Sequence, residues 1–315
     1  MLVDGKWSAD WHPVQASDAK GGFVRQTSSF RNWVTPDGGA GPTGEGGFKA
    51  EAGRYLLYVA LICPWASRTL MGRKLKKLEH AIPIEVVEPE LSPQGWRFPP
   101  GDDVLYMHEI YTRADPHYTG RATVPVLWDR SRQTIVNNES SDILRMLNSG
   151  FGALADDAID LYPAALASEI DALNARLYPA LNNGVYRAGF ATTQAAYAEA
   201  FEDVFCTLDE LEDRLQDGGF LCGATITEAD IRAFVTLVRF DVAYHGIFKC
   251  NRRRVTDYPA LNAYLFRVLD LPGVRETVNI EHIKRGYYSI SSLNPNGIVP
   301  LGPDIPGLTG QPETA

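Results

Sequence analysis

Hydrophobic and polar positions follow different rhythms in the two halves of the chain. Between residues 54 and 150, short apolar runs alternate with stretches of helical spacing. Strands are expected where apolar runs are bounded by turn residues, at 54–60, 82–87, 124–128 and 134–136. Helices are expected at 64–78 and 138–147. The resulting order, βαβ followed by ββα, predicts a small α/β domain.

From about residue 155 onward, apolar positions repeat at three and four residues, the spacing of amphipathic helices. One helix opens at Thr227, a good N-cap, and Asp230 three residues later can complete a capping box. Other helices are expected at 163–182, 193–216, 259–270 and 274–285. The second half is therefore predicted to be all-helical.

Three segments have the composition of loops. Residues 1–50 lack periodicity, although the aromatic Phe30 and Trp33 indicate that this arm docks on the rest of the protein. Residues 88–120 form a long insertion, of a length that is usually functional or disordered. A Pro/Gly-rich tail spans 294–312. We expect three parts: an N-terminal arm (1–50), an α/β domain (51–150) and a helical domain that ends in the tail (151–315).

Length and charge narrow the class of protein. With 315 residues, the chain exceeds the size at which one core usually keeps growing, so two domains are expected. Its net charge of -9 argues against a nucleic-acid binder, which needs a basic face. No leader segment and no apolar run long enough to span a membrane is apparent. We expect a cytoplasmic protein that binds neither nucleic acid nor membrane.

The four cysteines, at positions 63, 206, 222 and 250, show neither CxxC nor zinc-ligand spacing. Free thiols in a reducing compartment and no bound metal are therefore expected. Cys206 and Cys222 lie in otherwise apolar segments, where a cysteine is usually a small residue that fills the core, and Cys250 lies in a polar turn.

Cys63 has a different setting. It follows an apolar strand and precedes Pro64, a residue suited to the first position of a helix. Cys63 is thereby placed at the N-cap, facing unpaired N–H groups and the positive end of the helix dipole. That environment lowers the pKa of a thiol and makes the thiolate available near neutral pH. The pattern predicts thiol chemistry at Cys63.

Two sets of charged residues are expected to have a structural role and no catalytic one. Arg239 and Asp241 are expected to form an ion pair between helices. One helical stretch carries a basic cluster, interpreted as its solvated side, that comprises Arg73, Lys74, Lys76 and Lys77.

A βαβ–ββα unit whose first helix opens with a cysteine is the thioredoxin arrangement. With an all-helical second half, the chain resembles a glutathione transferase, so the expected fold is α/β plus all-α. Val124-Pro125 is similar to the step that carries a cis-proline in that fold, where the backbone of Val124 would pair with glutathione. The alternative is an edge strand that happens to contain a proline.

Glu139 and Ser140 open a helix at the end of the α/β domain. Glu139 can hold an ammonium group, while the Ser140 hydroxyl and the free N–H groups can take a carboxylate. A γ-glutamyl group presents both charges. The alternative is a plain N-cap with an acid that complements the helix dipole.

Longer motifs are similar to the xi-class transferases, the glutathionyl-hydroquinone reductases. The resemblance covers nearly the whole chain past residue 20, and its motifs include Cys63-Pro64-Trp65-Ala66, Gly95-Trp96, the run Arg113–Arg121, Thr123–Trp128, Asn138–Ser141, Arg239-Phe240-Asp241 and His282-Ile283-Lys284.

The resemblance implies a function and site residues. Cys63 would attack the sulfur of a glutathionyl-hydroquinone and form a mixed disulfide, which a second glutathione resolves. Tyr186 and Tyr287 match the substrate tyrosines of the family and could donate a proton; without the family they are ordinary core tyrosines. A homodimer through the helical domain is also implied. The expected glutathione contacts are Trp96, Arg121, Val124, Glu139 and Ser140.

Two alternative functions stay open at this point. An omega-type thioltransferase or dehydroascorbate reductase would also use Cys63, but would not remove glutathione efficiently from an aryl thioether. A non-catalytic interaction module of the same fold would lack a reactive thiolate, so rapid reaction with iodoacetamide at about pH 6 would separate it from an enzyme.

Overall fold

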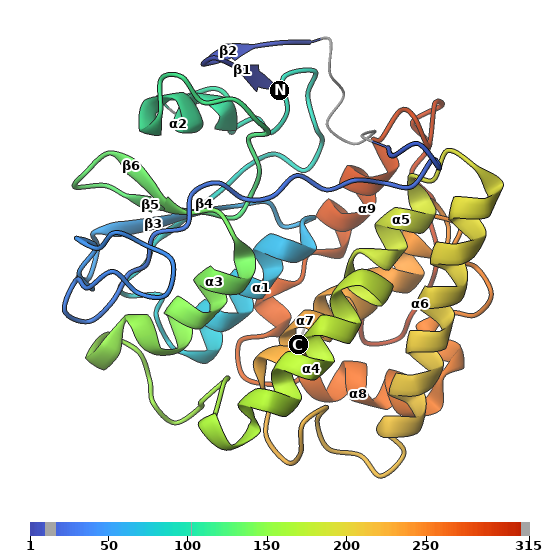
Figure 1. The fold of residues 1–315 in the computed structure, drawn as a ribbon. Coiled ribbons are helices and arrows are strands. Elements are labelled where there is room, and N and C mark those ends of the chain that lie inside the picture. Colours follow the sequence, from blue (N-terminus) through green and yellow to red (C-terminus); the bar gives the residue numbers. More distant parts are fainter. Residues whose placement is uncertain (10–16, 102, 310–315) are drawn as a thin grey trace.

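The computed structural model describes residues 1–9, 17–101 and 103–309. Residues 10–16 of the expected arm, residue 102 of the insertion and residues 310–312 of the tail lie outside the described residues. The chain folds into an α/β domain and a helical domain that pack side by side (Figure 1), as the pattern predicts.

Four strands form a mixed sheet in the order β4-β3-β5-β6. β3 (Tyr55–Val59) is parallel to β4 (Ile84–Val86) and antiparallel to β5 (Val126–Asp129), which pairs antiparallel with β6 (Thr134–Asn137). Every residue of β3 is buried, which explains why its sequence is a continuous apolar run. All four expected strands are confirmed.

Three helices cover this sheet. The expected helices are α1 (Pro64–Leu75) and α3 (Ser140–Arg145), the latter extended by the π-helix η1 (Met146–Gly150). α2 (Met107–Ala114) lies on the opposite face of the sheet (Figure 1) and was not expected, because the insertion shows no helical period. The first two strands and the second two are therefore linked by a helix.

The helical domain contains the expected helices with shifted ends. The segment predicted as one helix at 163–182 consists of a 3-10 helix (Ala164–Leu166), α4 and the π-helix η4 (Tyr178–Asn182). The helix α5 that follows was not predicted. The segment predicted at 274–285 is also divided, since Asn279 caps a new helix there. The helices of this domain are α4 (Ala167–Leu177), α5 (Gly184–Gly189), α6 (Gln194–Arg214), α7 (Glu228–Arg239), α8 (Pro259–Leu269) and α9 (Ile280–Tyr288).

The capping box at the start of α7 is confirmed. The Asp230 carboxylate accepts hydrogen bonds from the Thr227 amide at 2.8 Å, from the Leu221 amide at 2.8 Å and from the Tyr264 hydroxyl at 2.9 Å. Burial raises the pKa of Asp230, although all of these hydrogen bonds act in the opposite direction. The box therefore anchors α7 to α8 and to the preceding loop.

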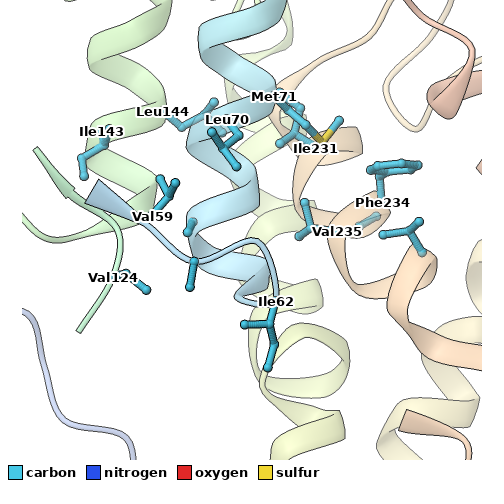
Figure 2. Packing of buried hydrophobic residues seen from close by; sticks show 14 of the residues in the cluster. Val59, Ile62, Leu70, Met71, Val124, Ile143, Leu144, Ile231, Phe234 and Val235 are labelled. Carbon is cyan, nitrogen blue, oxygen red and sulfur yellow. The ribbon is translucent and has the colours of Figure 1, made fainter. Parts of the chain in front are cut away.

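α1 packs between α3 and α7 (Figure 2) and joins the two domains. Leu70 and Met71 of α1 are buried, as are Ile231 and Phe234 of α7. Apolar surface that each domain could not cover by itself is removed from water at this contact. The contact also fixes the N-terminus of α1, and with it Cys63, against the helical domain.

The prediction that the basic cluster of α1 is solvated was wrong for two of its members. Arg73 is buried and donates to the Ile82 carbonyl at 2.5 Å, and Lys76 is buried and donates to the Ile159 carbonyl at 2.5 Å. Both long side chains bury their aliphatic stems and direct their charges at carbonyl oxygens. α1 lies in the centre of the molecule, which its charged sequence does not indicate.

The N-terminal arm docks against both domains, as Phe30 and Trp33 suggested. Figure 1 shows the arm crossing from the helical domain to the sheet. The Thr192 amide donates to the Gly21 carbonyl at 3.0 Å, and the Asn32 amide donates to the Val136 carbonyl at 3.0 Å. Two short strands, β1 (Leu2–Val3) and β2 (Lys6–Trp7), form a hairpin near its start.

None of the helices in the described part of the chain combines the length and the apolar character that a membrane span requires.

Candidate active site

A cavity of about 360 Å³ surrounds Cys63 and is lined by the arm, the α/β domain and the helical domain. It brings together seven of the eight residues that the sequence singled out, namely Cys63, Trp96, Arg121, Val124, Glu139, Ser140 and Tyr186. The eighth, Tyr287, is buried and hydrogen-bonds Tyr186 from outside the cavity wall. Residues far apart in the sequence therefore form one concave site.

Cys63 is the N-cap of α1, as predicted, and Pro64 occupies the first helical position. The backbone of Cys63 is extended, with φ −74° and ψ 119°, as expected for an N-cap. Its Sγ lies 3.6 Å from the Val124 carbonyl oxygen, to which the thiol donates. The peptide bond between Val124 and Pro125 is cis, also as expected.

The predicted lowering of the pKa of Cys63 was wrong. Burial raises the pKa of the thiol and outweighs four groups that lower it. These groups are the Ala66 amide, the charge of Arg239, the Trp65 amide and the charge of Arg25. The N-terminus of α1 acts in the predicted direction, but low solvation of the thiolate dominates.

This direction sets the pH dependence of alkylation at Cys63. Because the raised pKa leaves little thiolate at pH 6, iodoacetamide should react slowly there, so labelling at pH 6 does not by itself separate an enzyme from a non-catalytic module. The labelling rate should rise roughly tenfold per pH unit through about pH 8. Mass spectrometry of digested protein measures the labelling of each cysteine separately. Exposed Cys206 in the same digest serves as the control. A labelling rate at Cys63 that is already maximal at pH 6 would contradict the raised pKa.

Glu139 and Ser140 lie at the start of α3. The pKa of Glu139 is below its usual value. Burial alone would raise it, but hydrogen bonds from the amide and hydroxyl of Ser141 and from the Ser28 hydroxyl together outweigh that effect. The Ser140 hydroxyl is 3.4 Å from a terminal nitrogen of Arg68. An ionised acid therefore stands next to helix N–H groups, an arrangement that suits a zwitterionic amino-acid group.

Arg121 and Trp96 are half-buried on the wall of the same cavity. Burial and the nearby charge of Arg25 lower the pKa of Arg121 to about 10, so Arg121 is still cationic at neutral pH. The Arg121 amide donates to the side chain of Gln26 at 3.0 Å. This part of the cavity therefore carries positive charge.

A cluster of three tyrosines lies next to the cavity. The hydroxyl oxygens of Tyr186 and Tyr287 are 2.6 Å apart, and those of Tyr287 and Tyr244 are 2.8 Å apart. Burial raises the pKa of all three, so their hydroxyls are protonated at neutral pH. Tyr244 was missed, because its sequence context does not distinguish it from a tyrosine of the core.

The arm also contributes residues that the sequence did not indicate. Arg25 lies over the rings of Phe23, Trp65 and Tyr186 at 5.3, 4.8 and 4.9 Å from their centroids. Its Nε donates to the Asn183 side chain at 2.9 Å. These contacts hold the arm over the cavity. A segment without periodicity gave no signal for this role.

The expected ion pair between Arg239 and Asp241 is absent from the described structure. The Arg239 guanidinium donates to the carbonyls of Ile62 and Leu61, at 2.7 and 2.9 Å. The Asp241 carboxylate instead accepts a hydrogen bond from the Val255 amide at 2.6 Å. Both residues are buried, but a two-residue spacing directs them toward different neighbours.

The other cysteines lie away from the cavity lining. Cys206 is exposed, so its interpretation as core filler was wrong, whereas Cys222 and Cys250 are buried. Burial raises the pKa of Cys250 to about 12. Among the described residues, no group of three or more His, Cys, Asp or Glu side chains could hold a metal ion.

Comparisons with known proteins match both domains. Residues 62–149 match the glutathione S-transferase N-terminal domain, and residues 194–266 match the C-terminal domain. The glutathionyl-hydroquinone reductase YqjG of Escherichia coli is 50% identical, over 96% of this chain and 95% of its own. The glutathionyl-hydroquinone reductase PcpF of Sphingobium chlorophenolicum is 48% identical over 99% of both chains.

Solved structures agree. The glutathione-bound structure of YqjG superposes with a TM-score of 0.88 at 46% identity, over 96% of each chain. The glutathione-S-transferase Xi of Phanerochaete chrysosporium superposes with a TM-score of 0.86 at 44% identity, over 91% of this chain and 95% of its own. The similarity therefore extends over both domains.

Proposed function

The chain belongs to the glutathionyl-hydroquinone reductases of the xi class, within the glutathione transferase superfamily, and from that membership we propose that it reduces glutathionyl-hydroquinones with glutathione as cosubstrate. The observation that carries the proposal is the composition of one cavity. It joins a single cysteine to an acid at a helix N-terminus and to a tyrosine cluster. The first two suit glutathione, and the third suits an aromatic ring.

Cys63 is the nucleophile in this proposal. Its thiolate attacks the glutathionyl sulfur of the substrate and forms an S–S bond, while the C–S bond breaks and its electron pair stays with the ring carbon. That carbon takes a proton from the tyrosine cluster, through Tyr186 or Tyr287. The ring is thereby reduced by two electrons, and the two sulfur atoms are oxidised to a mixed disulfide.

A second glutathione completes the cycle. Its thiol gives a proton to the tyrosinate, and the resulting thiolate attacks the mixed disulfide at the glutathionyl sulfur. Oxidised glutathione leaves, and the Cys63 thiolate is restored. An external thiol is needed because Ala66 stands where a CxxC motif would have its second cysteine, and no other described cysteine lines the cavity.

Glutathione is held by the expected contacts. The backbone of Val124 pairs with the cysteinyl part, next to Cys63. Glu139 holds the ammonium of the γ-glutamyl group, and Ser140 with the N-terminus of α3 holds its carboxylate. Arg121 favours the second carboxylate of the tripeptide by charge. Trp96 packs against glutathione on the same wall.

Reaction with oxidised glutathione tests the nucleophile and the binding site together. Incubation at about pH 8 should add one glutathionyl mass to the protein, at Cys63, because the bound disulfide lies beside that thiol. Intact-mass and peptide mass spectrometry measure the site, and Glu139→Gln should slow the reaction. Labelling confined to exposed Cys206 would count against the proposal, since that cysteine has no tripeptide site around it.

Assembly and location are part of the proposal by family membership. We propose a homodimer formed through the helical domain, a cytoplasmic location and activity without a metal ion. Sedimentation of the purified protein tests the dimer, and turnover in the presence of a chelator tests metal independence.

A further inference from the structure

Arg239 ends α7 and is 1% exposed, at the contact between the helical domain and the loop that leads to Cys63. Its Nε and one terminal nitrogen donate to the carbonyls of Ile62 and Leu61. The same terminal nitrogen donates to the Ser67 hydroxyl at 2.5 Å, and the other donates to the Val235 carbonyl at 2.8 Å. Figure 2 shows Ile62 on the loop into α1 and Val235 on α7.

The charge of Arg239 is not neutralised by these contacts. All its acceptors are carbonyl or hydroxyl oxygens, and in the described part of the chain no carboxylate forms an ion pair with it. Asp241 is turned toward the amides of Val255 and Thr256. A buried cation without an anionic partner is costly, so the position favours any anion formed nearby.

Two groups in reach become anionic in the proposed reaction. Cys63 directly follows the two carbonyls that Arg239 binds, and the charge of Arg239 lowers the pKa of its thiol. Arg239 also directly precedes the π-helix η5 (Phe240–Tyr244), which carries Tyr244, and the Tyr244 hydroxyl is hydrogen-bonded to that of Tyr287, so the charge of Arg239 acts to lower the pKa of both tyrosines against the larger effect of burial. Arg239 therefore lies beside both the nucleophile and the tyrosine cluster.

We propose that Arg239 is the counter-charge for the anion that moves across the active site during turnover. The negative charge begins on the sulfur of Cys63 and, once the S–S bond has formed and the ring carbon has taken its proton, it resides on a tyrosine oxygen. Net charge is conserved, because the tyrosine loses the proton that the ring gains. This tyrosine half rests on the proposed function, whereas the thiolate half does not require turnover.

Arg239 acts through other groups, so it is a positioning residue, and a purely mechanical clamp is the competing explanation. A clamp would hold the loop through its hydrogen bonds and would not change the titration of Cys63. The pH dependence of thiol reactivity separates the two. The other groups that face the thiol are Arg25 from the arm, Tyr186 from α5 and the first amides of α1.

The experiment compares Arg239→Gln, Arg239→Lys and the wild type by iodoacetamide labelling of Cys63 across pH. Arg239→Gln keeps part of the hydrogen bonding but removes the charge, so its profile should shift up by about one pH unit, with labelling roughly tenfold slower at pH 7. Arg239→Lys keeps the charge and should stay within about half a unit. Arg73→Gln is the matched control, because Arg73 is also buried and also donates to backbone carbonyls, of Ile82 and Glu79.

Each outcome decides the matter. A shift in Arg239→Gln alone supports the proposal, and a profile in Arg239→Gln equal to that of the wild type overturns it. If circular dichroism shows that Arg239→Gln does not fold, Arg239→Lys decides, because lysine keeps the charge but cannot make all the hydrogen bonds of a clamp. A wild-type pH profile of labelling with turnover reduced less than tenfold supports a charge role. A profile shifted up by about one pH unit overturns it. If the labelling profile of Arg239→Gln shifts as expected but the wild type has no hydroquinone reductase activity, the role of Arg239 toward the thiolate is supported and the proposed function is rejected.

Discussion

Replacing Cys63 with alanine should reduce turnover of a glutathionyl-hydroquinone by at least about a thousandfold, to the uncatalysed level. No other described cysteine lines the cavity, so no neighbouring thiol can form the mixed disulfide in its place. The substitution removes only one sulfur atom, whose hydrogen bond to the Val124 carbonyl is long at 3.6 Å. Folding should therefore be unaffected, and steady-state kinetics together with thermal unfolding measures both effects.

Two further variants define this result. Cys206→Ser removes an exposed thiol and should leave turnover within about twofold of the wild type. Cys63→Ser should bind glutathione but fail to reduce the substrate, because a hydroxyl cannot form a disulfide. Substantial reductase turnover in Cys63→Ala would refute the nucleophile assignment, and dehydroascorbate as a second substrate would show whether the activity is specific for aryl thioethers.

Replacing Tyr287 with phenylalanine should lower kcat for the aryl substrate by about a hundredfold. Tyr287 is the middle member of the tyrosine cluster, so the change removes both hydrogen bonds, to Tyr186 and to Tyr244, and interrupts proton transfer. Glutathionylation of Cys63 by oxidised glutathione needs no proton on a ring carbon and should change less than threefold. The two measurements on one variant separate proton donation from damage to the site.

The matched control is Tyr258→Phe. The Tyr258 hydroxyl donates to Asp209 at 2.9 Å, in the helical domain and outside the cavity lining. This variant loses a tyrosine hydroxyl with a hydrogen bond of similar length and should keep its wild-type kcat. If Tyr287→Phe and Tyr258→Phe have equal activities, the cluster only shapes the pocket and does not supply the proton.

Signals carried by neighbouring residues predicted structure well. A cysteine followed by Pro64 located the start of α1, and Thr227 with Asp230 located the start of α7. Pro64 suits the first helical position because no intrahelical partner awaits an N–H group there, and Thr227 and Asp230 satisfy each other's backbone hydrogen bonds across three positions. Such patterns depend on residues within one helical turn, so the start of a helix can be predicted from them without knowledge of the tertiary structure.

Short helices were missed because they carry too few residues to display a period. α2 has 8 residues and α5 has 6. The Glu109 carboxylate closes the start of α2 by accepting from the Tyr106 amide at 2.9 Å, but tyrosine is not a usual N-cap. Packing stabilises these helices: α2 packs against the sheet and α5 against α6. Neither contact can be predicted from the residues of the helix alone.

Buried charges were interpreted wrongly for a related reason. Arg73 and Lys76 were expected to be solvated, because charged residues are usually exposed, whereas Arg239 was expected to pair with Asp241. Each is buried because carbonyl oxygens from other segments accept its hydrogen bonds. The location of those oxygens is a property of the assembled domains.

The sequence by itself determined which helix Cys63 caps and which family the chain resembles, because these depend on residues close along the chain. Only the tertiary structure decided the direction in which the pKa of Cys63 shifts, the placement of the arm over the cavity and the grouping of Tyr186, Tyr244 and Tyr287. Solvation and charge depend on every group within several ångströms, whatever its position in the sequence, and folding alone brings those groups together.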